Sequence, residues 1–350
     1  MNHRARWTLA RVAGALALSA LVACSWCANG TRTPPAGDRD ARVVSLPLRS
    51  MSLREARETL WPDATDVALQ PATAAQHEAL TRLVAALWRG VDVDRPPSEL
   101  AAWAHAAGFE LELWTVAGRR TWVVREAGHA RRGAGAYLVR ADLPPAGNAI
   151  LLQAPHVYFD VGTGGIAAAI FFAPDAPPAL RGLFTNSIHR YQAEPGARVA
   201  QDENPADVSH APDHLFQSAT RAVLSIGAPT IGAAAIVQIH GFDGERYADD
   251  PAATAELVVS AGRRDGSTPA SSRVASALGA LGITVVRFPE DTRELGATRN
   301  VQGELARTLG VEFVHLELAA PLRQRLRRDP RAAEPWARAL ADALAPRIEP

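Results

Sequence analysis

Two residue types are scarce or missing in this 350-residue sequence. Its only cysteines are Cys24 and Cys27, and none of its 37 Lys+Arg residues is a lysine. The body of the chain therefore has no thiol nucleophile or cysteine ligand for zinc, and no lysine for Schiff-base, phosphate-loop or Ser-x-x-Lys chemistry. The cationic residues are balanced by 37 Asp+Glu, so no net charge favours nucleic acid, and none is expected as a partner. The partner must be inferred from a local site.

Residues 1–23 have the order of a secretory signal peptide. Three arginines precede an apolar run that is too short to span a bilayer stably. The run ends in Leu-Val-Ala-Cys at positions 21–24, which resembles the lipobox of bacterial lipoproteins. The resemblance implies an acylated Cys24 that attaches the chain to a lipid membrane. Because Ser25 rather than Asp follows the cysteine, it also implies an outer-membrane location facing the periplasm. An ordinary cleaved signal with a chance cysteine is the alternative.

The remaining chain divides into three parts by composition. Residues 24–42 are rich in Gly, Thr, Pro, Asp and Arg, and this predicts a lipidated flexible tether. Residues 43–145 mix capped helices after Thr73 and Ser98 with a strand pair around a turn at 117–118, which predicts a small N-terminal α+β region. From 146 to 350, short apolar runs alternate with helical stretches. This pattern predicts a three-layer α/β domain with a mixed, largely parallel sheet.

The predicted strands of this last part end in residues with metal-binding side chains. The strand at 149–154 is followed by His156 and Asp160, and a second strand, at 234–239, by His240. Because sites in such sheets gather at the carboxyl ends of strands, we expect a zinc triad that leaves a fourth position for water. The final strand carries His315 and Glu317 on one face, and Glu317 is the candidate general base.

Each of these residues also has a structural alternative. His156 could be a strand-end histidine bonded to the backbone, and His240 a packed strand terminus. Asp160 could cap a helix or a turn. Glu317 could face solvent or pair with an arginine. Only their joint position at strand ends favours the metal site.

Substrate-binding candidates lie in the same part of the chain. Arg190 and Arg323 could hold a substrate carboxylate in a bidentate manner. His210 and His214 are four residues apart with a proline between them, so they do not form a metalloprotease helix motif. Either histidine could bind substrate or stabilise an oxyanion, and a structural role is the alternative. Asn300 is a further candidate for substrate binding.

A series of short motifs occurs in a recognisable order. They are Pro155-His156, Asp160 to Ala167, Asn186 to Arg190, Ile239 to Gly241, Asn300 to Gln302, and Leu316 to Leu318 followed by Arg323. This order resembles the zinc-dependent amidohydrolases related to N-formylglutamate amidohydrolase and phage poly-γ-glutamate hydrolase, which share a carboxypeptidase-like fold. The resemblance implies zinc ligation by His156, Asp160 and His240 and catalytic assistance by Glu317. Asp160 stands where that family more usually has glutamate.

Two functions from different classes are consistent with these patterns. The first is a zinc-dependent amidohydrolase of the cell envelope, acting on an amide bond of a cell-wall peptide or of a γ-glutamyl or N-acyl substrate. The second is a non-catalytic envelope lipoprotein that serves as a binding or scaffold module, which Asp160 in place of glutamate favours.

Overall fold

The structure is a computed structural model. It describes residues 46–62, 67–128, 130–143, 148–193, 204–226 and 233–345. The predicted signal peptide, Cys24 and the tether lie outside these residues. Within the described part of the chain, no helix is long and apolar enough to cross a membrane.

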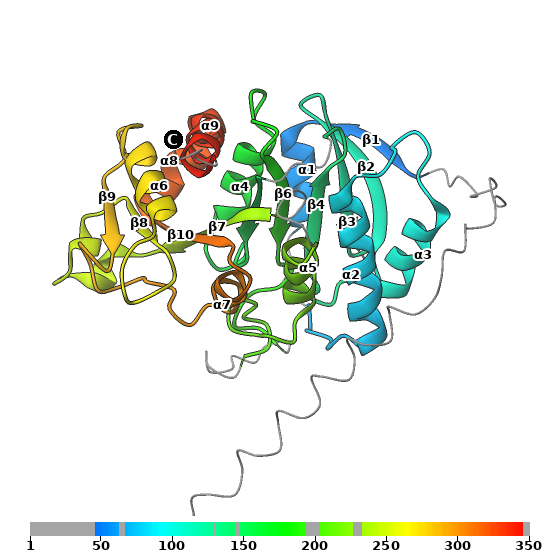
Figure 1. The fold of residues 1–350 in the computed structure, drawn as a ribbon, viewed down its shortest axis with the longest axis horizontal. Helices are drawn as coiled ribbons and strands as arrows, with labels where there is room; N and C mark the ends of the chain where they lie inside the picture. Colours follow the sequence, from blue (N-terminus) through cyan, green and yellow to red (C-terminus); the bar gives the residue numbers. More distant parts are fainter. Residues whose placement is uncertain are drawn as a thin grey trace, which may run out of the picture. The chain divides into compact units, whose positions relative to one another are not determined.

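One ten-stranded sheet has the order β1-β2-β3-β4-β6-β5-β7-β10-β8-β9 (Figure 1). Its strands are β1 (Leu48–Met51), β2 (Glu110–Val116), β3 (Arg119–Arg125), β4 (Ala136–Arg140), β5 (Ala149–Ala154), β6 (Leu180–Thr185), β7 (Ala233–Phe242), β8 (Leu257–Ser260), β9 (Val285–Phe288) and β10 (Glu312–Ala319). The central strands β6, β5, β7 and β10 are parallel, and antiparallel pairs join them to β4 and β8. The predicted mixed α/β sheet is confirmed.

Helices cover both faces of the sheet and complete three layers (Figure 1). One face carries α1 (Leu53–Leu60), α4 (Thr163–Phe171), α6 (Pro269–Gly279), α8 (Ala320–Arg328) and α9 (Glu334–Leu344), and the other α2 (Ala74–Arg89), α3 (Ser98–Ala107), α5 (Leu215–Leu224) and α7 (Val301–Thr308). Short 3-10 helices are η2 (Gly244–Tyr247), η3 (Pro251–Ala253) and η4 (Pro330–Ala333). Strand β5 packs Ile150 and Leu152 into one core and Leu151 into the other. Strand β5 is buried on both faces, and all of its side chains except that of Gln153 are apolar.

Local sequence signals mark the ends of several helices in the structure. Thr73 and Gln76 form the capping box of α2, and Gly108 ends α3 in the left-handed conformation. Strands β4 and β6 were not recognised, because every residue of each is buried and no polar alternation marks them. A buried arginine, Arg181, also interrupts the apolar run of β6. After β10 the described chain forms two helices, α8 and α9, separated by η4.

The predicted boundary at 145/146 is not a break in the sheet. Strand β4 pairs with β6, with Leu138 opposite Leu183. The guanidinium of Arg181 on β6 donates hydrogen bonds from Nε and Nη2 to the carbonyl of Trp88 on α2, at 3.0 and 2.7 Å. The described residues before and after this boundary belong to one compact unit.

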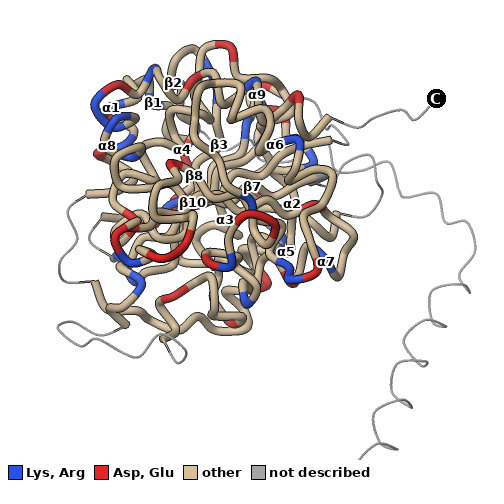
Figure 2. The backbone as a smooth tube through the Cα atoms, turned by 90° about the vertical axis from the view of Figure 1, so that its left-hand side faces the viewer, with Lys and Arg blue, Asp and Glu red and all other residues tan. Residues whose placement is uncertain are grey.

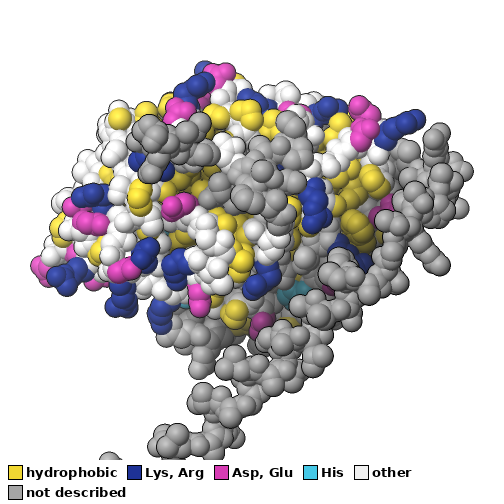
Figure 3. Space-filling view, viewed as in Figure 1, with side chains coloured by type: hydrophobic (Ala, Val, Ile, Leu, Met, Phe, Trp, Pro, Cys, Tyr) yellow, Lys and Arg dark blue, Asp and Glu magenta, His cyan; other side chains and the backbone are white. Residues whose placement is uncertain are grey.

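Charged side chains of both signs are spread over the surface. On the face shown in Figure 3, arginines and carboxylates are interspersed over the described residues. Arginines are concentrated on α8, which carries Arg323, Arg325, Arg327 and Arg328, and α1 lies near it (Figure 2). Because α8 directly follows β10, this arginine-rich helix begins at the same sheet edge as the candidate site.

Candidate metal centre

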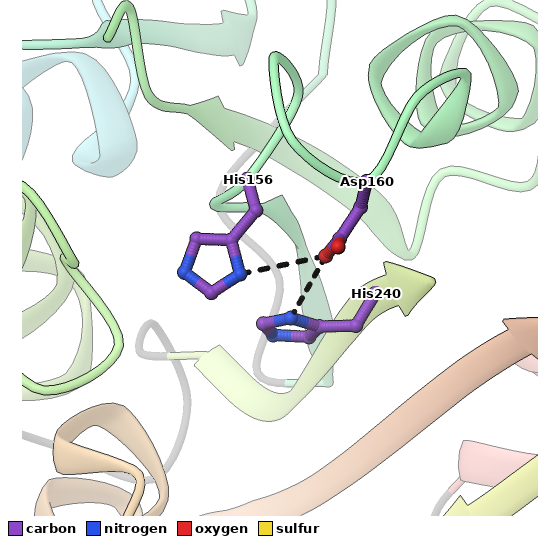
Figure 4. A group of neighbouring side chains, drawn as sticks. All are labelled: His156, Asp160 and His240. Carbon is purple, nitrogen blue, oxygen red and sulfur yellow. Dashed lines mark ion pairs between the residues drawn. The ribbon is translucent and has the colours of Figure 1, made fainter. Parts of the chain in front are cut away.

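The structure brings His156, Asp160 and His240 together at the carboxyl edge of the sheet (Figure 4). His156 follows β5, Asp160 lies in the turn that leads to α4, and His240 lies near the end of the adjacent parallel strand β7. Their side chains are almost completely buried. Oδ2 of Asp160 lies 3.4 Å from Nδ1 of His156 and 3.3 Å from Nδ1 of His240. The two rings therefore face the same carboxylate oxygen.

The hydrogen bonds of His240 indicate which of its nitrogens carries the proton. Nε2 lies 2.8 Å from Oε1 of Gln238, and this oxygen also accepts a bond from Nδ2 of Asn300 at 2.6 Å. Because a carbonyl oxygen only accepts, Nε2 is the donor, and Nδ1 of the neutral ring presents a lone pair to Asp160. Burial, assisted by the neighbouring His156, lowers the pKa of His240 to about 4. The ring is thus held in the form that binds a metal.

His156 is oriented by a carboxylate that the sequence did not single out. Its Nε2 lies 2.9 Å from Oδ1 of Asp207, which is fully buried. A carboxylate that bonds the outer nitrogen directs the other nitrogen inward, as carboxylates bonded to metal-binding histidines commonly do. Burial and Arg190 oppose protonation of His156, but the carboxylates of Asp160 and Asp207 outweigh them and raise its pKa. Protonation of His156 would therefore compete with metal binding at Nδ1.

Arg190 is also engaged at this point. Its Nη2 donates to Oδ2 of Asp207, and its Nη1 lies 3.2 Å from Nδ1 of His156. The described contacts of this guanidinium are with the protein's own buried groups. Arg190, predicted to hold a substrate carboxylate, instead supports His156 and Asp207. Because Nη1 and a metal compete for one lone pair, metal binding requires Arg190 to shift.

Asp160 supplies the negative charge of the group. Burial acts to raise its pKa, but the neighbouring rings of His156 and His240 outweigh this and hold the pKa of Asp160 well below its usual range. Its Oδ2 is buried and has no hydrogen-bond partner among the described residues. The helix-cap alternative does not hold, because the N-cap of α4 is Gly162 and no side chain caps that helix.

The donor set fits a zinc ion. Two neutral imidazoles and one carboxylate are typical ligands of catalytic zinc. Ligand atoms bound tetrahedrally at about 2.0–2.1 Å lie roughly 3.3–3.4 Å apart, which matches the measured distances from Oδ2 of Asp160 to the two Nδ1 atoms. The orphaned carboxylate oxygen is the atom that such an ion would satisfy.

A chain of buried amide side chains supports His240 from behind, and we call it the glutamine network. Nε2 of Gln238 donates to Oε1 of Gln153 at 2.9 Å and to Oε1 of Gln302 at 3.2 Å. Nε2 of Gln302 donates in turn to Oε1 of Gln217 at 3.0 Å. Its members are Gln153, Gln217, Gln238, Asn300 and Gln302. The network fixes the orientation of the Gln238 carbonyl that holds His240.

Glu317 lies beside the three ligands. It is directly opposite His240 in the parallel register of β7 and β10, and its side chain is 12% exposed. Its Oε2 is buried and has no hydrogen-bond partner among the described residues, which argues against both the solvent-facing and the arginine-paired alternatives. Burial and then the charge of Asp160 raise the pKa of Glu317 well above its ordinary value. The environments thus separate the two carboxyls into a charged Asp160 and a strongly basic Glu317.

Arg323 lies over the end of β7. A Cβ atom at Gly241 would lie 1.5 Å from Nη1 of Arg323, so a residue with a side chain there would exclude the guanidinium. Burial lowers the pKa of Arg323, while the charges of Asp160 and Glu317 act to raise it. Arg323 is therefore the predicted substrate-binding arginine that the structure places beside the ligands and the base.

Two predicted substrate-binding residues are engaged elsewhere. Asn300 caps α7 through Oδ1 and donates to Gln238 through Nδ2. Nδ1 of His214 accepts a bond from the Phe216 backbone at the start of α5, and its Nε2 lies 2.9 Å from the carbonyl of Gly133. Neither side chain keeps a polar atom for substrate, so both predictions are corrected to structural roles. Sequence spacing could not show these bonds, because one partner of each residue is more than 60 positions away.

His210 keeps an accessible edge. Its Nδ1 lies 3.1 Å from Oδ2 of Asp207, and its side chain is 25% exposed. It lines a cavity of about 290 Å³ together with Leu69, Pro71, Asn204 and Leu215. Asp207 also bonds Nε2 of His156, so this carboxylate connects His210, at the edge of the cavity, to the candidate metal ligands.

Comparison with known proteins gives only remote similarities. No family model and no curated protein matches the chain. A candidate carboxypeptidase A from Shewanella denitrificans has 11% identity and a TM-score of 0.39, covering 62% of this chain and 61% of its own. A metallo-carboxypeptidase from Burkholderia cenocepacia has 12% identity and a TM-score of 0.38 over 71% and 68%. An aspartoacylase family protein from Mesorhizobium loti has 12% and 0.37 over 65% and 66%.

This chain thus spans less than two thirds of the length of the Shewanella and Mesorhizobium proteins. At these identities and TM-scores, the matches decide neither the family nor the activity of the chain. Its function must be inferred from its own side chains.

Proposed function

We propose that this chain is a zinc-dependent amide hydrolase. The observation that carries the proposal is the convergence of Nδ1 of His156 and Nδ1 of His240 on one partnerless oxygen of Asp160. Acceptor atoms that face one another in a buried site repel unless a cation lies among them. A zinc ion held there would acidify a water molecule and polarise the scissile carbonyl.

Glu317 is the proposed proton carrier. Its Oε2 has no partner among the described residues, and its raised pKa makes it a stronger base than an ordinary carboxylate. It would take a proton from the attacking water and deliver that proton to the nitrogen of the leaving amine. The planar guanidinium of Arg323 would bind a substrate carboxylate or the developing oxyanion.

The substrate class and the location complete the proposal. A substrate with a carboxylate near its amide, such as a cell-wall peptide or a γ-glutamyl or N-acyl compound, is matched by Arg323 and by the accessible edge of His210. An acylated Cys24 would hold the chain at the outer membrane facing the periplasm, and residues 24–42 would provide reach. The resemblance of the leader sequence to a lipobox supports this location.

Metal analysis of the purified protein tests the proposal. The variants are His156→Ala and His240→Ala, and the matched control is His77→Ala, a half-buried histidine of α2 whose Nδ1 bonds Oγ of Ser218 at 2.7 Å. We expect about one zinc ion per chain in the wild type and the control, and loss of zinc from both site variants. Zinc content unchanged in both site variants would contradict the proposal. A zinc-free protein that binds envelope components would favour the scaffold alternative.

A further inference from the structure

A second group of metal-binding side chains adjoins the first. His240, His315 and Glu317 present ligand atoms that all lie within 4.8 Å of one another. His315 and Glu317 are two residues apart on β10 and so share a face, and Glu317 is opposite His240 on β7. The rings of His240 and His315 have centroids 4.6 Å apart. The proposed hydrolysis gives no role to His315.

His315 and Glu317 have buried atoms without partners. Nδ1 of His315 and Oε2 of Glu317 make no hydrogen bond to any described residue, and His315 is 3% exposed. Nε2 of His315 lies 3.6 Å from Oε1 of Glu317, too far for a good hydrogen bond. Leaving a buried polar atom unpaired costs about 1–3 kcal/mol. A neutral imidazole and a carboxylate left unpaired side by side are suited to a cation.

The surroundings of His315 leave its ring available to a cation. The ring is buried against that of His240, and no described group bonds its Nδ1. Asp160 adds negative charge nearby, whereas Arg190 and Arg323 add positive charge. The net charge around His315 and Glu317 therefore does not by itself attract a second cation. The affinity for this cation must come from the ligand atoms of the two residues.

We propose that His315 and Glu317 form a second, weaker cation position that fills only when metal is in excess. The inference rests on the proposed function, because the first ion engages Nδ1 of His240. The other nitrogen of His240 is held by Gln238, so neither is free for a second ion. With two protein ligands and a like charge close by, the second ion binds more weakly than the first.

Occupation of this position has a direct consequence for catalysis. An ion bound by Glu317 takes the carboxylate that would accept a proton from water. The hydrolase would therefore be inhibited by excess of the metal that activates it. His315 acts in this proposal as a residue that sets metal sensitivity, without touching the substrate.

Equilibrium dialysis against rising zinc concentrations, with metal counted by mass spectrometry, tests the inference on the full chain. The variants are His315→Gln and Glu317→Gln, with His77→Gln as control. We expect the wild type and the control to bind a second equivalent at excess zinc, and both variants to stop at one. In parallel, the ratio of activity at excess zinc to activity at stoichiometric zinc should fall at least several-fold in the wild type and stay near one in His315→Gln.

The possible outcomes separate the inference from the proposed function. A second equivalent that binds equally well to His315→Gln and Glu317→Gln would overturn the inference. A single equivalent in all four proteins would also overturn it, while the proposed function would stand. Absence of zinc from every protein would overturn the proposed function itself. Thermal melting checks that each variant is folded, and Glu317→Gln carries the test if His315→Gln is not.

Discussion

Two buried polar regions meet at His240, and they differ in how fully their atoms are paired. In the glutamine network, Gln238 makes hydrogen bonds through both its oxygen and its nitrogen, and so does Gln302. On the opposite side of His240 lie Asp160 and Glu317, which we call the unpaired group. Oδ2 of Asp160 and Oε2 of Glu317 have no hydrogen-bond partner among the described residues. Both regions are largely shielded from solvent, because Gln238 and Gln302 are 0% exposed and Asp160 is 3% exposed.

The difference identifies the role of each region. A fully paired buried network rigidifies the structure and fixes side-chain orientation. Unpaired buried atoms cost stability, and a protein retains them where a ligand will pair with them. The glutamine network therefore holds His240 in place, and the unpaired group is where chemistry occurs. Variants on the two sides should fail in different ways.

The largest effect is expected for Glu317, one of the two residues with an unpaired buried oxygen. The substitution Glu317→Gln keeps the shape of the side chain but removes its proton-accepting charge. Because positioned general bases contribute about 10²–10⁴-fold to rate, kcat on a model amide should fall by roughly that factor while the first zinc ion stays bound. Steady-state kinetics with zinc analysis of the same sample measures both. Activity within a few-fold of the wild type would remove Glu317 from the mechanism.

The second-largest effect is expected in the glutamine network. Gln238→Leu removes the acceptor for Nε2 of His240, and loss of such an outer partner typically costs about 10–100-fold in metal affinity. Gln302→Leu, one link further out, is the matched control. Both variants should lose roughly 1–3 kcal/mol of unfolding free energy, but only Gln238→Leu should lose zinc in a chelator competition. Equal loss of zinc from both would show that the network acts only through general stability.

A smaller effect is expected for Asp207, which orients the metal ligand His156 as Gln238 orients His240. Asp207→Asn keeps a hydrogen-bond acceptor for Nε2 of His156 but removes the charge that pairs with Arg190. We expect zinc affinity to fall by about tenfold, near the lower end of the range for such outer partners. The competition assay described for Gln238 measures it. Unchanged affinity would mean that the charge of Asp207 does not support the metal ligands.

The smallest expected effect concerns His214, a buried histidine outside the glutamine network whose two ring nitrogens are both hydrogen-bonded. Burial lowers its folded-state pKa to about 4, below the ordinary value of 6.5. Between these values the unfolded chain takes up a proton that the folded chain does not, so stability is full above pH 6.5 and falls as pH is lowered. His214→Asn keeps a helix-capping side chain without the titration.

Urea unfolding at pH 7 and pH 5 measures this difference. The wild type should lose roughly 1–2 kcal/mol more than His214→Asn between these pH values. An equal loss in the two proteins would mean that His214 is not held neutral by the fold.

The sequence by itself was sufficient for the central strands β5, β7 and β10 and for the residues at their ends, but not for β6. Each signal is local: β5 is a short apolar run followed by His156 and Asp160, and β10 places Glu317 by simple alternation. Parallel neighbours present their carboxyl ends at one edge, so these residues were expected to meet, and the structure places them together. The leader sequence, with Cys24, likewise predicts export and lipidation, and that remains a prediction.

Only the tertiary structure decided which atoms are paired. Asp207 lies 51 positions from His156 in a stretch without periodicity, and Gln238 meets Asn300 across 62 positions. Such partners depend on strand register and on how loops fold over the sheet edge, which no local pattern encodes. For the same reason Asn300 and His214 were assigned to substrate, and the unpaired atoms of Asp160, His315 and Glu317 could not be foreseen. Sequence determined which residues reach the site, and packing determined which of them remain free to bind a ligand.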